Sequence, residues 1–168
     1  MRNGTPRVVV AGGGIAALET LLALRALAPG LTNATLLCPD KEFVYAPLGV
    51  IEPFGLGDVP RFDLDEILAD LGAEKIQDTL AAVDCERRLL KSEGGEDLDF
   101  DAALIAIGAQ ADAAIEGALT YRGARDGQAL ARVLGELERG DVRKRCFCDS
   151  GGHPVAAADL RARFDDRP

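Results

Sequence analysis

Three small residues near the N-terminus have the spacing of a site for a dinucleotide pyrophosphate. Gly12, Gly14 and Ala17 fit the pattern G-x-G-x-x-A. The first glycine of this pattern permits a tight turn, the second lets a pyrophosphate approach the backbone, and the third small residue allows close packing of a helix on a strand. The N–H groups and the dipole of the following helix also favour negative charge. The motif therefore predicts phosphate binding, and a glycine turn that binds nothing is the alternative.

The residues on either side of this turn predict the elements that the motif requires. Residues 8–10 are a β-branched run typical of a strand, and Pro29 with Gly30 is a stop signal for the helix that follows the turn. An apolar face at helical spacing comes from Leu18, Leu21, Leu22, Leu24 and Leu27. Residues 34–38 predict a second strand, which gives a parallel βαβ unit.

The end of this second strand is a candidate for contacts with a ribose. In such units an acid at this place binds a ribose hydroxyl. Cys38 stands at about that position, and Asp40 lies two residues further on. Asp40 is either a substitute for the usual acid or an ordinary turn residue.

The remaining segments predict an α/β fold, a Rossmann-like parallel sheet with an inserted antiparallel β-meander. Residues 43–57 are irregular but rich in apolar side chains, which we expect to lie against the domain's own core or a flavin ring. Asp63 and Glu66 form a capping pattern for a helix that ends near Gly72. The meander is expected over residues 75–84, 88–92 and 97–100, a buried parallel strand over 102–109, and a capped helix over 126–140.

Composition excludes several classes of function. The chain has 168 residues, about one domain, and a net charge of −9, which disfavours nucleic acid and anionic membrane surfaces. No apolar run reaches the roughly 18 residues of a spanning helix. Four cysteines without a C-x-x-C pair and a single histidine, His153, predict neither a disulfide framework nor a metal site. We expect a soluble, cytoplasmic, reduced protein.

Three motifs in order resemble the two-dinucleotide-binding-domain flavoproteins, the pyridine nucleotide-disulfide oxidoreductase superfamily. They are residues 12–19 (GGGIAALE), 43–48 (FVYAPL) and 100–109 (FDAALIAIGA). The second motif is most similar to the branch of the type II NADH dehydrogenases and sulfide:quinone oxidoreductases. The resemblance covers about residues 7–144.

The resemblance implies FAD as the cofactor. It places the FAD pyrophosphate along Gly12, Gly13, Gly14, Ile15 and Ala16. It places the isoalloxazine ring near Pro47 and Leu48. The cofactor site would then be closed by Ala106, Ile107, Gly108 and Ala109.

The chain departs from the family pattern in ways that limit the expected chemistry. Ile107 replaces the usual threonine of an ATG-like turn, and no C-x-x-x-x-C pair follows the first βαβ unit, which disfavours disulfide-reductase chemistry. No residue is a convincing proton donor or nucleophile. The second dinucleotide domain, expected near Val142 for NAD(P)H, and a later Gly-Asp segment do not occur in these 168 residues.

The expected function is therefore that of the FAD-binding portion of a truncated oxidoreductase. Such an enzyme passes electrons from NAD(P)H or sulfide to a quinone-like acceptor. The alternatives are a stand-alone nucleotide-binding module and an inactive remnant. Residues 1–144 are assigned to the FAD-binding domain. Residues 145–168 form an atypical tail without a clear period, which predicts either disorder or a reading-frame change.

Overall fold

The computed structural model describes residues 4–109, 119–121, 123, 126–140, 147–148 and 154–155. The chain divides into two compact units. The first comprises Met1–Tyr45 with Pro60–Ala109, and the second comprises Ala46–Val59 with Gln110–Pro168.

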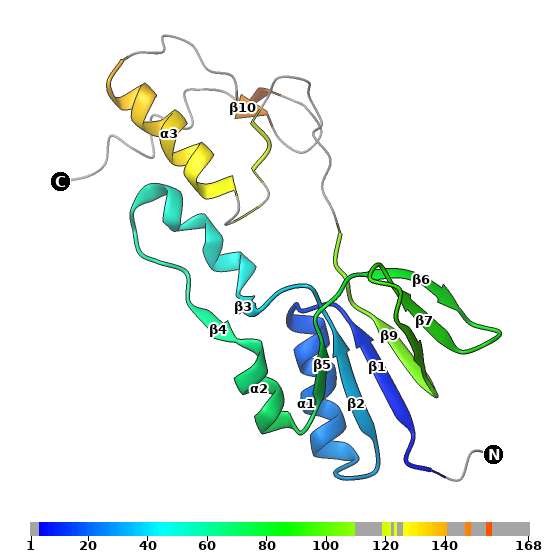
Figure 1. Ribbon diagram of the computed structural model, residues 1–168. Coiled ribbons are helices and arrows are strands. Elements are labelled where there is room, and N and C mark those ends of the chain that lie inside the picture. The colour runs from blue at the N-terminus through cyan, green and yellow to red at the C-terminus, as the bar shows by residue number, and fades with distance from the viewer. Residues whose placement is uncertain are drawn as a thin grey trace. The chain divides into compact units, whose positions relative to one another are not determined.

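A parallel sheet organises the first unit (Figure 1). It consists of β1 (Arg7–Ala11), β2 (Asn33–Leu37), β5 (Glu74–Ile76) and β9 (Ala102–Ile105), in the order β5-β2-β1-β9. All three pairings are parallel. This order corresponds to strands 3-2-1-4 of a doubly wound sheet, which confirms the predicted fold class.

Two helices cover one face of this sheet. They are α1 (Ile15–Leu27) and α2 (Leu64–Leu71), and their buried leucines pack with Val10 and Leu36 of the sheet. Helix α2 begins and ends as predicted. Asp63 accepts hydrogen bonds from the amides of Asp65 and Glu66 at 2.7 and 3.2 Å, and Gly72 adopts the left-handed C-cap conformation.

An antiparallel meander covers the other face. Its strands are β6 (Leu80–Asp84), β7 (Leu89–Ser92) and β8 (Asp97–Asp99). Leu90 of β7 is fully buried against Val9, Ala11 and Leu37 of the sheet. The meander is confirmed, but its predicted start was wrong: β5 is a separate strand that pairs in parallel with β2.

The other elements are short. Strands β3 (Glu42–Val44) and β4 (Arg61–Asp63) pair antiparallel in the first unit. The second unit contains the 3₁₀ turns η1 (Ala46–Val50) and η2 (Glu52–Phe54), helix α3 (Gly127–Glu138), and the antiparallel pair β10 (Phe147–Cys148) and β11 (Pro154–Val155). Apart from these two strands, residues 145–168 lie outside the described residues, and so does the prediction made for them.

Exposure differs from the sequence prediction at several places. Leu22 and Leu27 of α1 are 48% and 84% exposed, so Leu18, Leu21 and the half-buried Leu24 form its core face. Strand β9 was expected to be buried, yet every residue in it is exposed. In the irregular segment, side chains expected against a core or a ring are also exposed: Tyr45, Leu48 and Phe54. Helix α3 forms, but the Asp126 side chain makes no cap hydrogen bond.

Asp78 precedes β6 and links it by hydrogen bonds to the turn between β7 and β8. Its Oδ1 accepts the Thr79 amide at 2.7 Å, and its Oδ2 accepts the Gly94 amide at 2.8 Å. A hydrogen bond from the Ser92 side chain, and then those from the two amides, lower the pKa of Asp78 below its ordinary value of 3.8.

We expect Asp78→Asn to lower the melting temperature at neutral pH. The folded pKa is depressed, so the stabilisation is complete above the ordinary pKa and is lost as the pH falls through the folded value. The difference between variant and parent should therefore shrink below pH 3.8. Thermal unfolding followed by circular dichroism over a pH series measures it, with Asp97→Asn of the same meander as the control. A difference that stays constant at all pH values would contradict the assignment.

Candidate functional site

Three loops meet at the carboxyl edge of the parallel sheet, where ligands bind in open α/β sheets. One follows β1 at Gly12, one follows β2 at Cys38, and one follows β9 at Ala106. Each loop begins with a backbone hydrogen bond to the neighbouring strand. The Gly12 amide donates to Leu37 O at 2.8 Å, the Ala106 amide to Ala11 O at 2.7 Å, and the Cys38 amide to Ile76 O at 3.0 Å. The sheet therefore sets the relative positions of the three loops.

Gly12 is required by the fold. Its φ of +118° lies in a region that other residues rarely adopt, and an added Cβ would overlap the Ala106 carbonyl oxygen and lie 2.6 Å from its carbon. The first loop and the third loop touch here.

Gly14 has no such structural reason to be glycine. Its backbone is extended, with φ −87° and ψ −176°, and an added Cβ would meet nothing within 4 Å. It is the N-cap residue of α1, and the next residues, Ile15 and Ala16, are exposed at the helix start. The first N–H groups of a helix have no partner within the helix, so they are available to an anion in this open space. Ala17 is fully buried, as the third small position of the motif requires.

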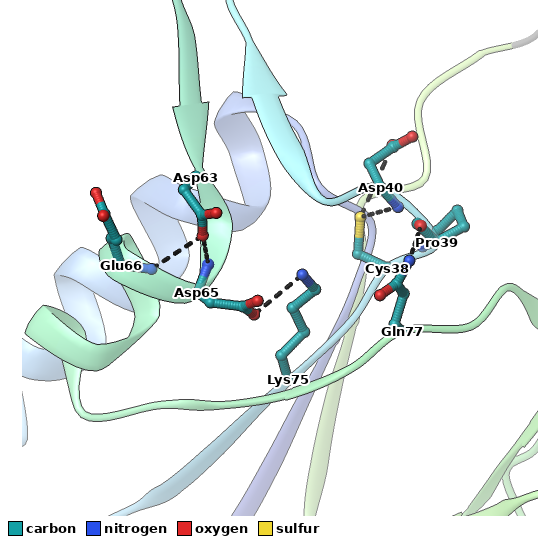
Figure 2. A network of polar contacts seen from close by, with 8 residues as sticks. All are labelled: Cys38, Pro39, Asp40, Asp63, Asp65, Glu66, Lys75 and Gln77. Atoms are coloured by element: carbon teal, nitrogen blue, oxygen red, sulfur yellow. Dashed lines mark hydrogen bonds and ion pairs between the residues drawn. The ribbon is translucent and has the colours of Figure 1, made fainter.

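The two candidates for ribose contacts occupy different environments (Figure 2). Cys38 is fully buried in the core cluster beneath α1 and α2, and its Sγ stands where a Cβ of Gly13 would be. Burial raises the pKa of the Cys38 thiol, so the group stays protonated. Asp40 is exposed, and its Oδ2 lies 3.8 Å from the sulfur. Of the two side chains, that of Asp40 is accessible to a ligand.

Gln77, which follows β5, contacts this loop, and Lys75 of β5 contacts helix α2; the sequence predicted neither contact. Gln77 Nε2 donates to the Pro39 carbonyl at 3.2 Å. The Lys75 side chain is 8% exposed, and its Nζ pairs with Asp65 Oδ1 at 3.0 Å (Figure 2). These two contacts were not predicted because the sequence pattern placed residues 75–77 in the antiparallel meander.

The third loop completes the edge. Ala106 is half-buried against Gly12, whereas Ile107 is 63% exposed and Gly108 has a φ of +73°. The glycine turn, Cys38, Asp40 and the start of the 106–109 loop thus all lie in the first unit. Pro47 and Leu48 lie in η1 of the second unit, and their role at the ring stays a prediction.

Among the residues that the structure describes, no group of three or more histidine, cysteine, aspartate or glutamate side chains could hold a metal ion. Within the same part of the chain, no helix is long and apolar enough to cross a membrane.

Comparison with known proteins finds similar oxidoreductases. No model of a known protein family matches the chain. The chain is 29% identical over 184 residues to demethylphylloquinone reductase NdbB of Synechocystis sp., covering 99% of this chain and 45% of that protein. The sulfide:quinone oxidoreductase of Aquifex aeolicus superposes with a TM-score of 0.73 at 23% identity, over 80% of this chain and 32% of that one. NDH2 of Plasmodium falciparum, solved with NADH, gives a TM-score of 0.68 at 19% identity, over 83% of this chain and 31% of that one.

The chain spans less than half the length of each of these relatives. The two structural likenesses show the fold, and the match to NdbB extends along nearly the whole chain. The chain therefore has the fold of these FAD/NAD-binding Rossmann-type oxidoreductases, and along nearly its whole length its sequence is similar to part of one quinone reductase, in line with the resemblance to the two-dinucleotide-binding-domain flavoproteins.

Proposed function

We propose that this chain is the FAD-binding portion of a flavin-dependent oxidoreductase that passes electrons from NAD(P)H or sulfide to a quinone-like acceptor. The observation that carries the proposal is the open space at Gly14 in front of the exposed start of α1. The names of the relatives support the chemistry, since they include a sulfide:quinone oxidoreductase and a demethylphylloquinone reductase.

The residues at the sheet edge fit the two ends of such a cofactor's ADP half. Gly13, Gly14, Ile15 and Ala16 present backbone at the helix start, where a pyrophosphate gains from amide donors and from the helix dipole. Asp40, 26 positions after Gly14, is exposed at the end of β2 and accepts ribose hydroxyls in the proposal.

The flavin half of the cofactor is proposed to contact two less polar segments of the chain. In the proposal, the 106–109 loop closes over the cofactor from the end of β9, and Pro47 and Leu48 contact the ring. FAD supplies the electron transfer when bound, and the protein supplies binding and orientation. In the proposed function, NAD(P)H and the quinone bind to a longer form of the protein. The proposed location of the protein is the cytoplasm.

A stand-alone nucleotide-binding module is the second candidate. It rests on the same open space at Gly14 and the same exposed start of α1, which suffice to bind a nucleotide without turnover. The two candidates share the FAD site and differ in turnover.

We expect Gly14→Val to weaken FAD binding by at least about tenfold, or about 1.4 kcal/mol, because its side chain would fill the space that the pyrophosphate takes. The melting temperature without FAD should change little, since the added Cβ meets nothing within 4 Å. Fluorescence titration with FAD and thermal unfolding measure the two effects. Gly4→Val is the matched control, because its Cβ also meets nothing and Gly4 lies at the opposite end of β1. Equal affinity of the Gly14 variant and the parent would place the site elsewhere.

These 168 residues, tested by themselves, are expected to bind FAD weakly and to show negligible turnover. The domain that the family resemblance assigns to NAD(P)H is not among them. The assay combines saturating FAD, NADH and a soluble quinone and follows NADH absorbance, with fluorescence titration of the protein up to saturating FAD as the test of binding. Sustained turnover would contradict the expectation, and absence of any bound flavin at saturating FAD would contradict the proposed function.

A further inference from the structure

Gly13 and Cys38 face each other across the carboxyl ends of β1 and β2. A Cβ at Gly13 would overlap Cys38 Sγ, whereas the next nearest atoms would be Cys38 Cβ at 3.6 Å and Leu64 Cδ1 at 3.7 Å. The latter are ordinary contact distances. Gly13 is not among the glycines with positive φ. A single atom, the sulfur, therefore excludes a side chain from position 13.

The sulfur is held in place from its other side. The Asp40 amide donates to Cys38 Sγ at 3.4 Å, and Asp40 Oδ2 lies 3.8 Å from the same sulfur (Figure 2). A neutral thiol both accepts and donates weak hydrogen bonds, so it can satisfy the amide and the carboxylate together. Cys38 is fully buried, and rotation of its side chain away from Gly13 would break these contacts.

We propose that Cys38 is a positioning residue of the cofactor site, whose sulfur spaces the glycine turn at Gly13 from the loop that carries Asp40. This inference rests on the proposed function, because it gives the turn to the pyrophosphate and Asp40 to the ribose. It predicts that positions 13 and 38 are coupled by size, so that a side chain at 13 is tolerated only when the atom on Cys38 Cβ is smaller or absent.

The test is a double-mutant cycle read by FAD titration. Gly13→Ala alone should weaken FAD binding by about tenfold or more, because overpacking at a rigid site displaces the turn. Cys38→Ala alone should weaken it by about threefold, since Asp40 loses only weak contacts to sulfur. In the double variant Gly13→Ala/Cys38→Ala, binding should return to within about threefold of Cys38→Ala, which additive effects would not produce.

Two further variants separate size from general structural damage. Gly13→Ala/Cys38→Ser should recover only in part, because the hydroxyl oxygen is smaller than sulfur but is still present. Gly13→Ala/Cys85→Ala is the matched control and should not recover, since Cys85 is the exposed cysteine of the meander turn. A double variant with Cys38→Ala that binds no better than Gly13→Ala would overturn the inference, and so would parent-like binding by Gly13→Ala.

The melting temperatures of the same variants without FAD test the size coupling between positions 13 and 38 independently of the cofactor. The overlap exists in the chain itself, so Gly13→Ala should lower the melting temperature and Cys38→Ala should restore it in the double variant. If the parent binds no FAD, the proposed function fails while this coupling can still hold. If the parent binds FAD and neither affinity nor melting temperature recovers, the inference fails by itself.

Discussion

The parallel register of β1 between β2 and β9 is the constraint on which the site depends. Val10 lies opposite Leu36 on one side and opposite Leu104 on the other. Because the three strands run in the same direction, their carboxyl ends coincide, and the loops that follow them converge. The amides of Gly12 and Ala106 extend this ladder beyond the last paired residues. A shift by one residue would turn each side chain to the other face and separate the loops at the same time.

Packing around this sheet is uneven. Val10 and Leu36 are fully buried, whereas Leu104 is 37% and Ile105 46% exposed. A continuous apolar run is typical of a parallel strand covered on both faces, which is why residues 102–109 predicted a buried strand. The apolar sequence indicates a strand, but it does not determine how much of the strand other residues cover. Pairing with β1 therefore explains where β9 lies in the sheet, but it does not explain why the side chains of β9 are apolar.

Local signals predicted local structure, and non-local pairing was where prediction failed. The limits of α2 followed from Asp63 and Gly72, because a capping carboxylate and a left-handed glycine act within one turn of the helix. Strand β5 has only three residues, and nothing in them distinguishes a parallel partner in β2 from an antiparallel one in the meander. The same limit hid Lys75 and Gln77, whose partners at Asp65 and Pro39 are 10 and 38 positions away.

The three glycines of the turn look alike in the sequence, yet they are glycine for different reasons. Gly12 is fixed by its own conformation and by the Ala106 carbonyl, and Gly13 is fixed by the sulfur of Cys38. Both reasons lie within the chain, so either glycine would be needed in a protein that bound nothing. Gly14 has an ordinary backbone conformation and open space around it. The fold therefore gives no reason for glycine at this position, and in the proposed function the reason is the pyrophosphate that would occupy the open space.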